Sequence, residues 1–241
     1  MTTPPTPPST PSSPPGTTLT DAGAFSLEEL ADLFNRAYEG YAVPTHVDAG
    51  MVAFMQDVLD IDPERSRVAL RDGKPVGMAM LSMRGDAGWV GGMGVFAEAR
   101  RCGIGDQLMR ALIGQAREAG ARRLGLEVLE QNLAARALYD KLGFRALRRL
   151  EVYVLAGPGR PPALTAVACA PREARRRIQA ARRADEPWQR ADATLDRLDV
   201  SLARGEREPI TFCVYPFQDL GKVKVTADVG IITKHLIDFF E

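Results

Sequence analysis

The stretch EARRCGIGDQLM, Glu98 to Met109, places two arginines before two glycines that are one residue apart, and then continues as an amphipathic pattern. Glycines at a strand-to-helix turn let backbone N–H groups point into one concavity, where the helix N-terminus also favours negative charge. Each N–H bond to a charged oxygen contributes about 1.5–3 kcal/mol, whereas the helix dipole contributes about 0.3–1 kcal/mol. The turn around Gly103 and Gly105 is therefore predicted to bind an anion, most often phosphate, through its backbone.

Three alternative roles of this turn each require a different flanking sequence. A dinucleotide-binding fold requires a third glycine, but Leu108 occupies that position, even though Glu127 lies where the acidic ribose ligand is expected. A P-loop is excluded because no Gly-Lys-Ser/Thr follows the glycines. A plain helix start, in which the glycines serve only the turn, is an open alternative that other segments must decide.

The elements expected before the turn are a short strand-like stretch that begins at Thr17, two helices and a β-meander. Ser26 is a predicted helix N-cap, with Glu29 three residues later as in a capping box. A second helix is predicted over 49–59. The segment 66–95 alternates as strand, Asp-Gly turn, strand, glycine-rich turn and strand.

After the turn the pattern predicts a helix over 105–120, a strand over 122–129, a helix capped by Asn132, and a last strand near 150–155. The predicted fold class is α/β of the α+β type, with a mixed, mostly antiparallel central sheet flanked by helices. The sheet would place the anion-binding turn at the end of the meander's last strand.

Composition divides the chain into four segments. A disordered tail rich in Pro, Ser and Thr is predicted over 1–16, a first domain over 17–156, a linker over 157–163, and a smaller α+β domain over 164–241. The smaller domain is predicted to contain two helices, two strands and a short apolar-faced helix over 231–240. It weakly repeats half of the first domain and is expected either to cover that domain or to pair two copies as a homodimer.

The overall composition excludes several classes of protein. There are 31 basic and 31 acidic side chains, which gives no argument for nucleic-acid binding. The cysteines Cys102, Cys169 and Cys213 form no cluster, so neither a disulfide framework nor a metal site is expected. No apolar run approaches the ~20 residues that a membrane helix needs, and the expected location is the cytoplasm. An arginine-rich helix over 172–183 either attracts an acidic partner or forms a solvated face.

Two sequence blocks together resemble the GNAT family of acetyl-CoA-dependent N-acetyltransferases, over about residues 19 to 155. The signature Arg/Gln-x-x-Gly-x-Gly/Ala is matched by Arg100, Gly103 and Gly105. The second block, Asn-x-x-Ala-x-x-x-Tyr followed by Gly-Phe, is matched by Asn132, Ala135, Tyr139, Gly143 and Phe144. The smaller domain contains neither block, so no CoA site is expected there.

By this resemblance the anion is the pyrophosphate of acetyl-CoA, the acyl-donor cosubstrate. The pantetheine arm would pair with the backbone of Met93 and Val95, and the glycines of VGGMGV would permit close approach of the ligand or form a bulge that kinks the sheet. The resemblance implies these cofactor-binding residues: Met93, Val95, Arg100, Arg101, Cys102, Gly103, Ile104, Gly105, Asp106, Asn132 and Tyr139.

The implied reaction is direct attack of a neutral amine on the thioester, with a backbone N–H near Met93 or Gly94 stabilising the oxyanion. Tyr139 is the family-matched group that donates a proton or a hydrogen bond to the departing sulfur; the alternative is an aromatic ring that only packs. The general base is not named clearly. Glu127 is favoured over Glu130, and a surface salt-bridge partner is the alternative role for Glu127.

The acceptor pocket is expected around the loop after the first helix, with Tyr38, Tyr41 and His46 as substrate-binding candidates. The sequence predicts a small amine as the acceptor, ahead of a peptide N-terminus. The alternative function is a non-catalytic acetyl-CoA sensor or scaffold, because many relatives carry a glutamate in the strand before the signature and this chain does not.

Overall fold

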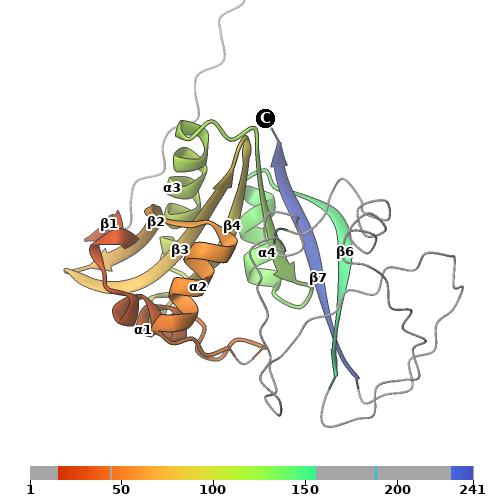
Figure 1. The fold of residues 1–241 in the computed structure, drawn as a ribbon, viewed down its shortest axis with the longest axis horizontal. Helices are drawn as coiled ribbons and strands as arrows, with labels where there is room; N and C mark the ends of the chain where they lie inside the picture. The colour runs from red at the N-terminus through yellow and green to blue at the C-terminus, as the bar shows by residue number, and fades with distance from the viewer. Residues whose placement is uncertain (1–15, 44, 156–187, 189–228, 241) are drawn as a thin grey trace, which may run out of the picture. The chain divides into compact units, whose positions relative to one another are not determined.

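The structure is a computed structural model that describes residues 16–43, 45–155, 188 and 229–240 (Figure 1). The chain divides into two compact units. The first comprises residues 1–126, 133–145 and 237–241, and the second comprises residues 127–132 and 146–236. The predicted linker over 157–163 and the arginine-rich segment over 172–183 lie outside the described residues, and the predicted domain boundaries stay predictions.

The described elements agree in type and order with the sequence pattern over the first 155 residues. They are β1 (Thr17–Asp21), a 3-10 turn (Ala22–Ala24), α1 (Leu27–Ala37), α2 (Ala49–Leu59), β2 (Ile61–Arg71), β3 (Lys74–Arg84), β4 (Ala87–Val95), a 3-10 turn (Ala97–Ala99), α3 (Ile104–Glu118), β5 (Arg123–Leu129), α4 (Leu133–Lys141), β6 (Arg145–Leu155) and β7 (Val229–Phe240).

The sheet of the first unit is mixed and mostly antiparallel. Neighbouring strands from β1 to β4 run antiparallel, and β4 then pairs with β5 in parallel. The parallel ladder joins Ala87, Gly88 and Trp89 to the first residues of β5. The predicted fold class is confirmed by this topology.

The start of α1 follows from local sequence. The Ser26 hydroxyl accepts a hydrogen bond from the Glu29 N–H at 3.2 Å, and the Glu29 carboxylate accepts one from the Ser26 N–H at 2.8 Å. This capping box pairs two donors that would otherwise lack intrahelical acceptors. Leu30 and Phe34 then fall one turn apart and are both buried. The predicted capping box is confirmed.

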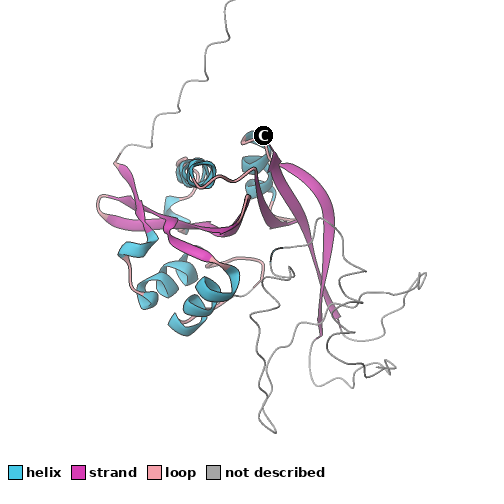
Figure 2. Ribbon diagram, turned by 45° about the horizontal axis from the view of Figure 1, so that its top comes forward, coloured by secondary structure: helices cyan, strands magenta, loops and turns pink. Residues whose placement is uncertain are grey.

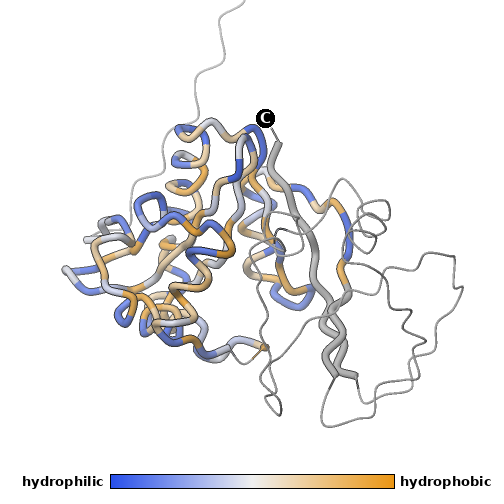
Figure 3. The backbone as a smooth tube through the Cα atoms, in the orientation of Figure 1, coloured by the Kyte–Doolittle hydropathy of each residue, from blue (hydrophilic) through white to orange (hydrophobic). Residues whose placement is uncertain are grey.

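Helices cover both faces of this sheet. Figure 2 shows α3 on one face, and α1 and α2 on the other. Hydrophobic and hydrophilic residues are interspersed along α3 (Figure 3). Leu108, Leu112 and Ala116 are buried, whereas Arg110, Arg117 and Glu118 are exposed. The helix is therefore amphipathic, as its sequence predicts, and its N-terminus is fixed by packing on the sheet.

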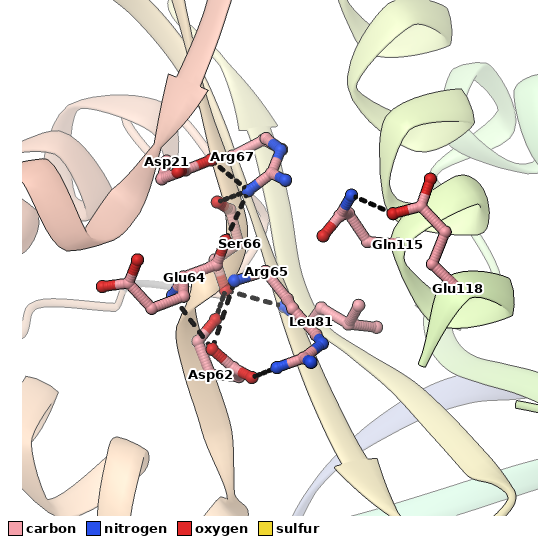
Figure 4. A network of polar contacts seen from close by, with 9 residues as sticks. All are labelled: Asp21, Asp62, Glu64, Arg65, Ser66, Arg67, Leu81, Gln115 and Glu118. Atoms are coloured by element: carbon pink, nitrogen blue, oxygen red, sulfur yellow. Dashed lines mark hydrogen bonds and ion pairs between the residues drawn. The ribbon is translucent and has the colours of Figure 1, made fainter. Parts of the chain in front are cut away.

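β2 contains an irregularity that its sequence alone does not reveal. The register between β2 and β3 shifts between Asp62 and Arg67, and the buried Ser66 compensates. Its hydroxyl donates to the Asp62 carbonyl at 2.7 Å and accepts from the Leu81 N–H at 3.0 Å, as Figure 4 shows. One side chain thus replaces a missing ladder bond on each strand.

We expect Ser66→Ala to lower the free energy of unfolding by about 1–3 kcal/mol, because the Leu81 N–H would be buried without an acceptor. The matched control is Ser82→Ala, since the Ser82 hydroxyl is buried and has no hydrogen-bond partner within the described part of the chain. Ser82→Ala should be neutral or slightly stabilising. Urea unfolding followed by circular dichroism measures both, and equal losses would show that Ser66 contributes no special bond.

The helix predicted over 231–240 is wrong. These residues belong to strand β7, and β7 neighbours β6 in the sheet order. The physical reason is composition: the segment is rich in β-branched Ile and Thr, whose restricted χ1 angles disfavour a helix and suit a strand. The helical spacing of apolar residues in this segment indicated its structure less well than its content of β-branched residues did.

Candidate functional site

The glycine turn has the backbone geometry that its sequence predicts. Gly103 is the N-cap of α3 and has a φ of 83°, in the left-handed region that favours glycine. Arg101, two residues earlier, also has a positive φ of 63°. The first α3 N–H to reach a carbonyl belongs to Gln107, which donates to the Gly103 oxygen at 3.1 Å. The N–H groups of 103–106 therefore lack intrahelical acceptors and are available to an anion.

Arg100 braces this turn with its side chain. Its Nε donates to the Val95 carbonyl at 2.9 Å, and one of its terminal nitrogens donates to the Glu39 carbonyl at 3.3 Å. The guanidinium thus joins the turn to the end of β4 and to the segment after α1. Its observed bonds go to protein carbonyls, which makes Arg100 a positioning residue in this structure.

The other residues of the turn contribute in different ways. The Ile104 side chain is buried in the core, so only its backbone faces the turn. Cys102 is exposed, and its thiol donates to the Arg100 carbonyl at 3.4 Å. A Cβ built on Gly105 would lie 3.4 Å from a Leu138 methyl, so Gly105 lies against α4. The turn is held between β4 and α4.

Asp106 is neutralised by two cations. Its carboxylate accepts from Arg110 at 2.6 Å and from Lys141 of α4 at 2.8 Å. Burial acts to raise the pKa of Asp106, but the hydrogen bonds and charges of Arg110 and Lys141 outweigh it and hold the pKa below its usual range. The pair of bridges compensates a negative charge that would otherwise repel an anion at the helix start.

The strand β4 contains a bulge, and its pairing with β5 ends before the glycine turn. Gly91 is the extra residue of a bulge, because Leu81 pairs with Val90 and Met80 pairs with Gly92. The alternative that the glycines form a bulge is thus confirmed at Gly91. Within the described residues no pairing with β5 extends past Trp89. Beyond the bulge, this edge of β4 has no strand partner among the described residues.

Met93 and Val95 present their backbone groups along that open edge. They lie two residues apart in an antiparallel pairing, so their N–H and C=O groups point to the same side. The Val95 carbonyl is taken by Arg100, and the Met93 backbone acts to lower the pKa of the Tyr38 hydroxyl. Any further strand-like pairing at Val95 must therefore use its N–H.

The space above two of the β4 glycines is filled by α1. A Cβ on Gly94 would lie 2.8 Å from the Ala37 Cβ and 2.9 Å from its carbonyl oxygen. A Cβ on Gly92 would lie 2.9 Å from the Tyr38 hydroxyl oxygen and 2.7 Å from a terminal carbon of Met80. The expectation that these missing side chains make room for a ligand is corrected here: at 92 and 94 they make room for α1.

Tyr38 and Tyr41 meet at the face of β4 that carries Gly92, and a third tyrosine lies in α4. Tyr38 stacks on Phe34 with ring centroids 4.3 Å apart and meets Tyr41 edge-on at 5.2 Å. Tyr139, from α4, is buried and packs against Phe144 at 5.8 Å. Tyr38 and Tyr41 both interact electrostatically with Tyr139, so the structure brings these three predicted residues near one another.

The hydroxyls of Tyr38 and Tyr139 stay protonated at neutral pH. Burial raises the pKa of Tyr139 far above its usual range, and the electrostatic interaction that its ionised form would have with Tyr38 and Tyr41 adds to this effect. Burial and then Tyr41 raise the pKa of Tyr38 to about 12, although its hydrogen bond to Met93 acts in the opposite direction. Both residues are therefore hydrogen-bond donors, not phenolates, at neutral pH.

Three further predicted site residues lie in the loop after α1 or in the second unit. His46 is exposed in the loop between α1 and α2. Glu127 and Asn132 belong to the second unit, so their roles stay predictions. Sequence reasoning missed Asn35, whose side chain donates to the Val47 carbonyl and accepts from the Val47 N–H, both at 2.8 Å. The only feature of the sequence that could have indicated this contact was an asparagine on the half-buried face of α1.

Among the described residues, no group of three or more His, Cys, Asp or Glu side chains could hold a metal ion. No helix in the described ranges has the length and apolar character needed to cross a membrane.

Comparison with known sequences gives a consistent family. Residues 27–144 match the model of the acetyltransferase (GNAT) family. Over 50 residues the chain is 46% identical to the uncharacterized N-acetyltransferase YobR of Bacillus subtilis, which covers 21% of this chain and 20% of that protein. Over 100 residues it is 32% identical to N-alpha-acetyltransferase 30 of Schizosaccharomyces pombe, which covers 39% of this chain and 67% of that protein. The matched segment spans only a fifth of YobR.

Among solved structures, the chain is similar to Ard1 from Thermoplasma volcanium. The two are 24% identical with a TM-score of 0.49, and the likeness covers 56% of this chain and 86% of that one.

Proposed function

Since the chain belongs to the acetyltransferase (GNAT) family, a family of acyltransferases, we propose that it moves the acetyl group of acetyl-CoA to the amine of a small molecule. One observation carries the proposal: the N–H groups at the start of α3 lack intrahelical acceptors, in a turn whose Gly105 lies against Leu138 of α4 and Val95 of β4.

The residues present fit acetyl-CoA. The N–H groups from Arg101 to Asp106 would hold the pyrophosphate, because four of them have no intrahelical acceptor. The open edge at Met93 and Val95 would pair with the pantetheine arm as an added strand does. Asn132 completes this set as a family-matched position.

The reaction is a direct transfer in a ternary complex. The lone pair of a neutral amine attacks the thioester carbon, the new C–N bond forms, the C–S bond breaks, and CoA leaves as a thiolate. A thiol has a pKa of about 8.5 and tyrosine one of about 10, so full proton transfer from tyrosine is uphill by about 2 kcal/mol. The raised pKa of Tyr139 increases that cost, so its role is to donate a hydrogen bond to the sulfur.

The free-energy cost of deprotonating the acceptor amine differs between classes of acceptor. Freeing a lysine-like amine at pH 7 costs about 4–5 kcal/mol, whereas an α-amine costs about 1 kcal/mol. We propose Glu127, acting through water, as the base. An acceptor whose ammonium form has a low pKa depends least on Glu127.

A peptide N-terminus is the second candidate acceptor. It is favoured by one observation, the 32% identity to a protein named N-alpha-acetyltransferase 30. An N-terminal α-amine also has the low pKa that reduces the need for a strong base.

The test is release of CoA thiol from acetyl-CoA by the full chain, across a panel of small primary amines, polyamines and short peptides with different first residues. We expect saturable thiol release with at least one acceptor, and heat-inactivated protein is the control. Thermal stabilisation by acetyl-CoA without turnover of any amine would instead favour a sensor or scaffold. No binding of acetyl-CoA would defeat both functions.

A further inference from the structure

Asp106 joins the start of α3 to the helix α4. It lies in the first turn of α3, where its backbone N–H is one of those without an intrahelical acceptor. Its carboxylate Oδ1 accepts a hydrogen bond from Lys141, in the last turn of α4, at 2.8 Å. The same residue thus belongs to the proposed anion site and binds the helix that carries Tyr139.

The Asp106 carboxylate is already oriented by α3 itself. Arg110, one turn later in this helix, donates to the other oxygen, Oδ2, at 2.6 Å. The Asp106 side chain is only 15% exposed. An isolated surface ion pair contributes little, because two long side chains must be ordered to form it. Here the carboxylate is held in advance, so only Lys141 has to be ordered.

The position of α4 depends on its contacts with α3. An isolated helix of nine residues is marginal in water, and among the nine described residues of α4 only Tyr139 is buried. Leu138 and Lys141 lie three residues apart, on one side of the helix. The Leu138 methyl lies 3.4 Å from a Cβ built on Gly105, and Lys141 binds Asp106. Both contacts are made with the first turn of α3.

We infer that Asp106 and Lys141 are positioning residues, whose ion pair holds the Tyr139 hydroxyl at a fixed distance from the turn that binds the pyrophosphate. This inference rests on the proposed function. Tyr139 lies between Leu138 and Lys141 in the sequence, so their two contacts fix the turn of α4 from which it projects. A hydrogen-bond donor assists a reaction only while it is held within reach of the reacting atom.

The first test is Lys141→Met in the full chain, which keeps the length of the side chain and removes its charge. The Lys141 side chain is 64% exposed, so the variant should fold, and circular dichroism checks this. We expect kcat with the best amine of the panel to fall about 10-fold, less than the ~100-fold that a 1 Å misplacement costs. The Kd for acetyl-CoA should rise less than about threefold, because Arg110 still neutralises Asp106. Lys141→Arg should restore most of kcat.

The second test repeats Lys141→Met in a Tyr139→Phe background. The double variant should lose less than about twofold in kcat beyond Tyr139→Phe, because the hydroxyl that the ion pair positions is already absent. Asp106→Ala should behave as Lys141→Met does in both backgrounds. Arg110→Met is the matched comparison, since it removes the other cation bound to Asp106 but lies on α3 itself. It should lower kcat less than Lys141→Met does.

The outcomes separate this inference from the proposed function. Equal falls in kcat in the two backgrounds would show that Lys141 does not act through Tyr139, and an unchanged kcat would show that the ion pair has no part in the reaction. A rise in Kd without a fall in kcat would make Lys141 a cation for the cosubstrate instead. Each of these results overturns the inference and leaves the proposed function standing. If acetyl-CoA does not bind the unaltered protein, both fail.

Discussion

Gly103→Val is expected to raise the Kd for acetyl-CoA by at least about 100-fold, since losing N–H bonds of about 1.5–3 kcal/mol each has that effect. Gly103 has a φ of 83°, a conformation in which a β-branched residue is strained by about 1–3 kcal/mol. The turn would relieve this strain by rotating, which misdirects its N–H groups. Isothermal titration of acetyl-CoA into both proteins measures the change.

The matched control is Gly120→Val, at the other end of α3. Gly120 has a φ of 85° and meets no atom within 4 Å of a built Cβ, so the backbone strain is comparable. The site is roughly 25 Å from Gly103 along the helix, and the Kd should not change although the Tm falls.

Arg100→Ala should weaken binding less than Gly103→Val, because its side chain bonds protein carbonyls. Equal Kd values for Gly103→Val and the unaltered protein would contradict the backbone site.

The second large effect is expected in Tyr139→Phe. The ring should keep its packing on Phe144, so the variant removes only the hydroxyl. A hydrogen bond to a charged sulfur contributes about 1.5–3 kcal/mol, which corresponds to a fall in kcat of about 10–100-fold. Steady-state thiol release gives kcat, and the Kd for acetyl-CoA should stay close to that of the unaltered protein.

The pH profile supplies a further check on Tyr139. A tyrosine donates while it is protonated, which is below its pKa, and burial moves that pKa upward. The kcat profile should therefore show no fall on its alkaline side up to about pH 10. A falling limb near neutral pH that disappears in Tyr139→Phe would show that the hydroxyl ionises in the working range.

Features set by neighbouring residues were predictable from the sequence. The capping box at Ser26 and Glu29, the helix over 49–59 and the glycine turn at Gly103 all depend on contacts within a few residues. The chain order of strands and helices from the meander to β6 also followed from the sequence pattern, whereas β7 did not, because its residues were predicted to form a helix. Local propensity and turn chemistry were sufficient there.

Features that depend on distant segments were not predictable in the same way. The glycines at 92 and 94 suggested room for a ligand, but only the packing of α1 shows that Ala37 and Tyr38 fill that space. The Tyr38 hydroxyl lies close to Gly92, although these residues come from the end of α1 and from β4. Such pairings arise from tertiary packing, which leaves no periodic signal in the sequence.

The central claim is that this chain moves an acetyl group from acetyl-CoA to an amine. The direct measurement is mass spectrometry of the acceptor after incubation with the full chain and acetyl-CoA carrying a labelled acetyl group. We predict that the label appears on the amine nitrogen at the rate of thiol release, and that Gly103→Val abolishes both. Thiol release without label on any acceptor, or no thiol release at all, would contradict the account.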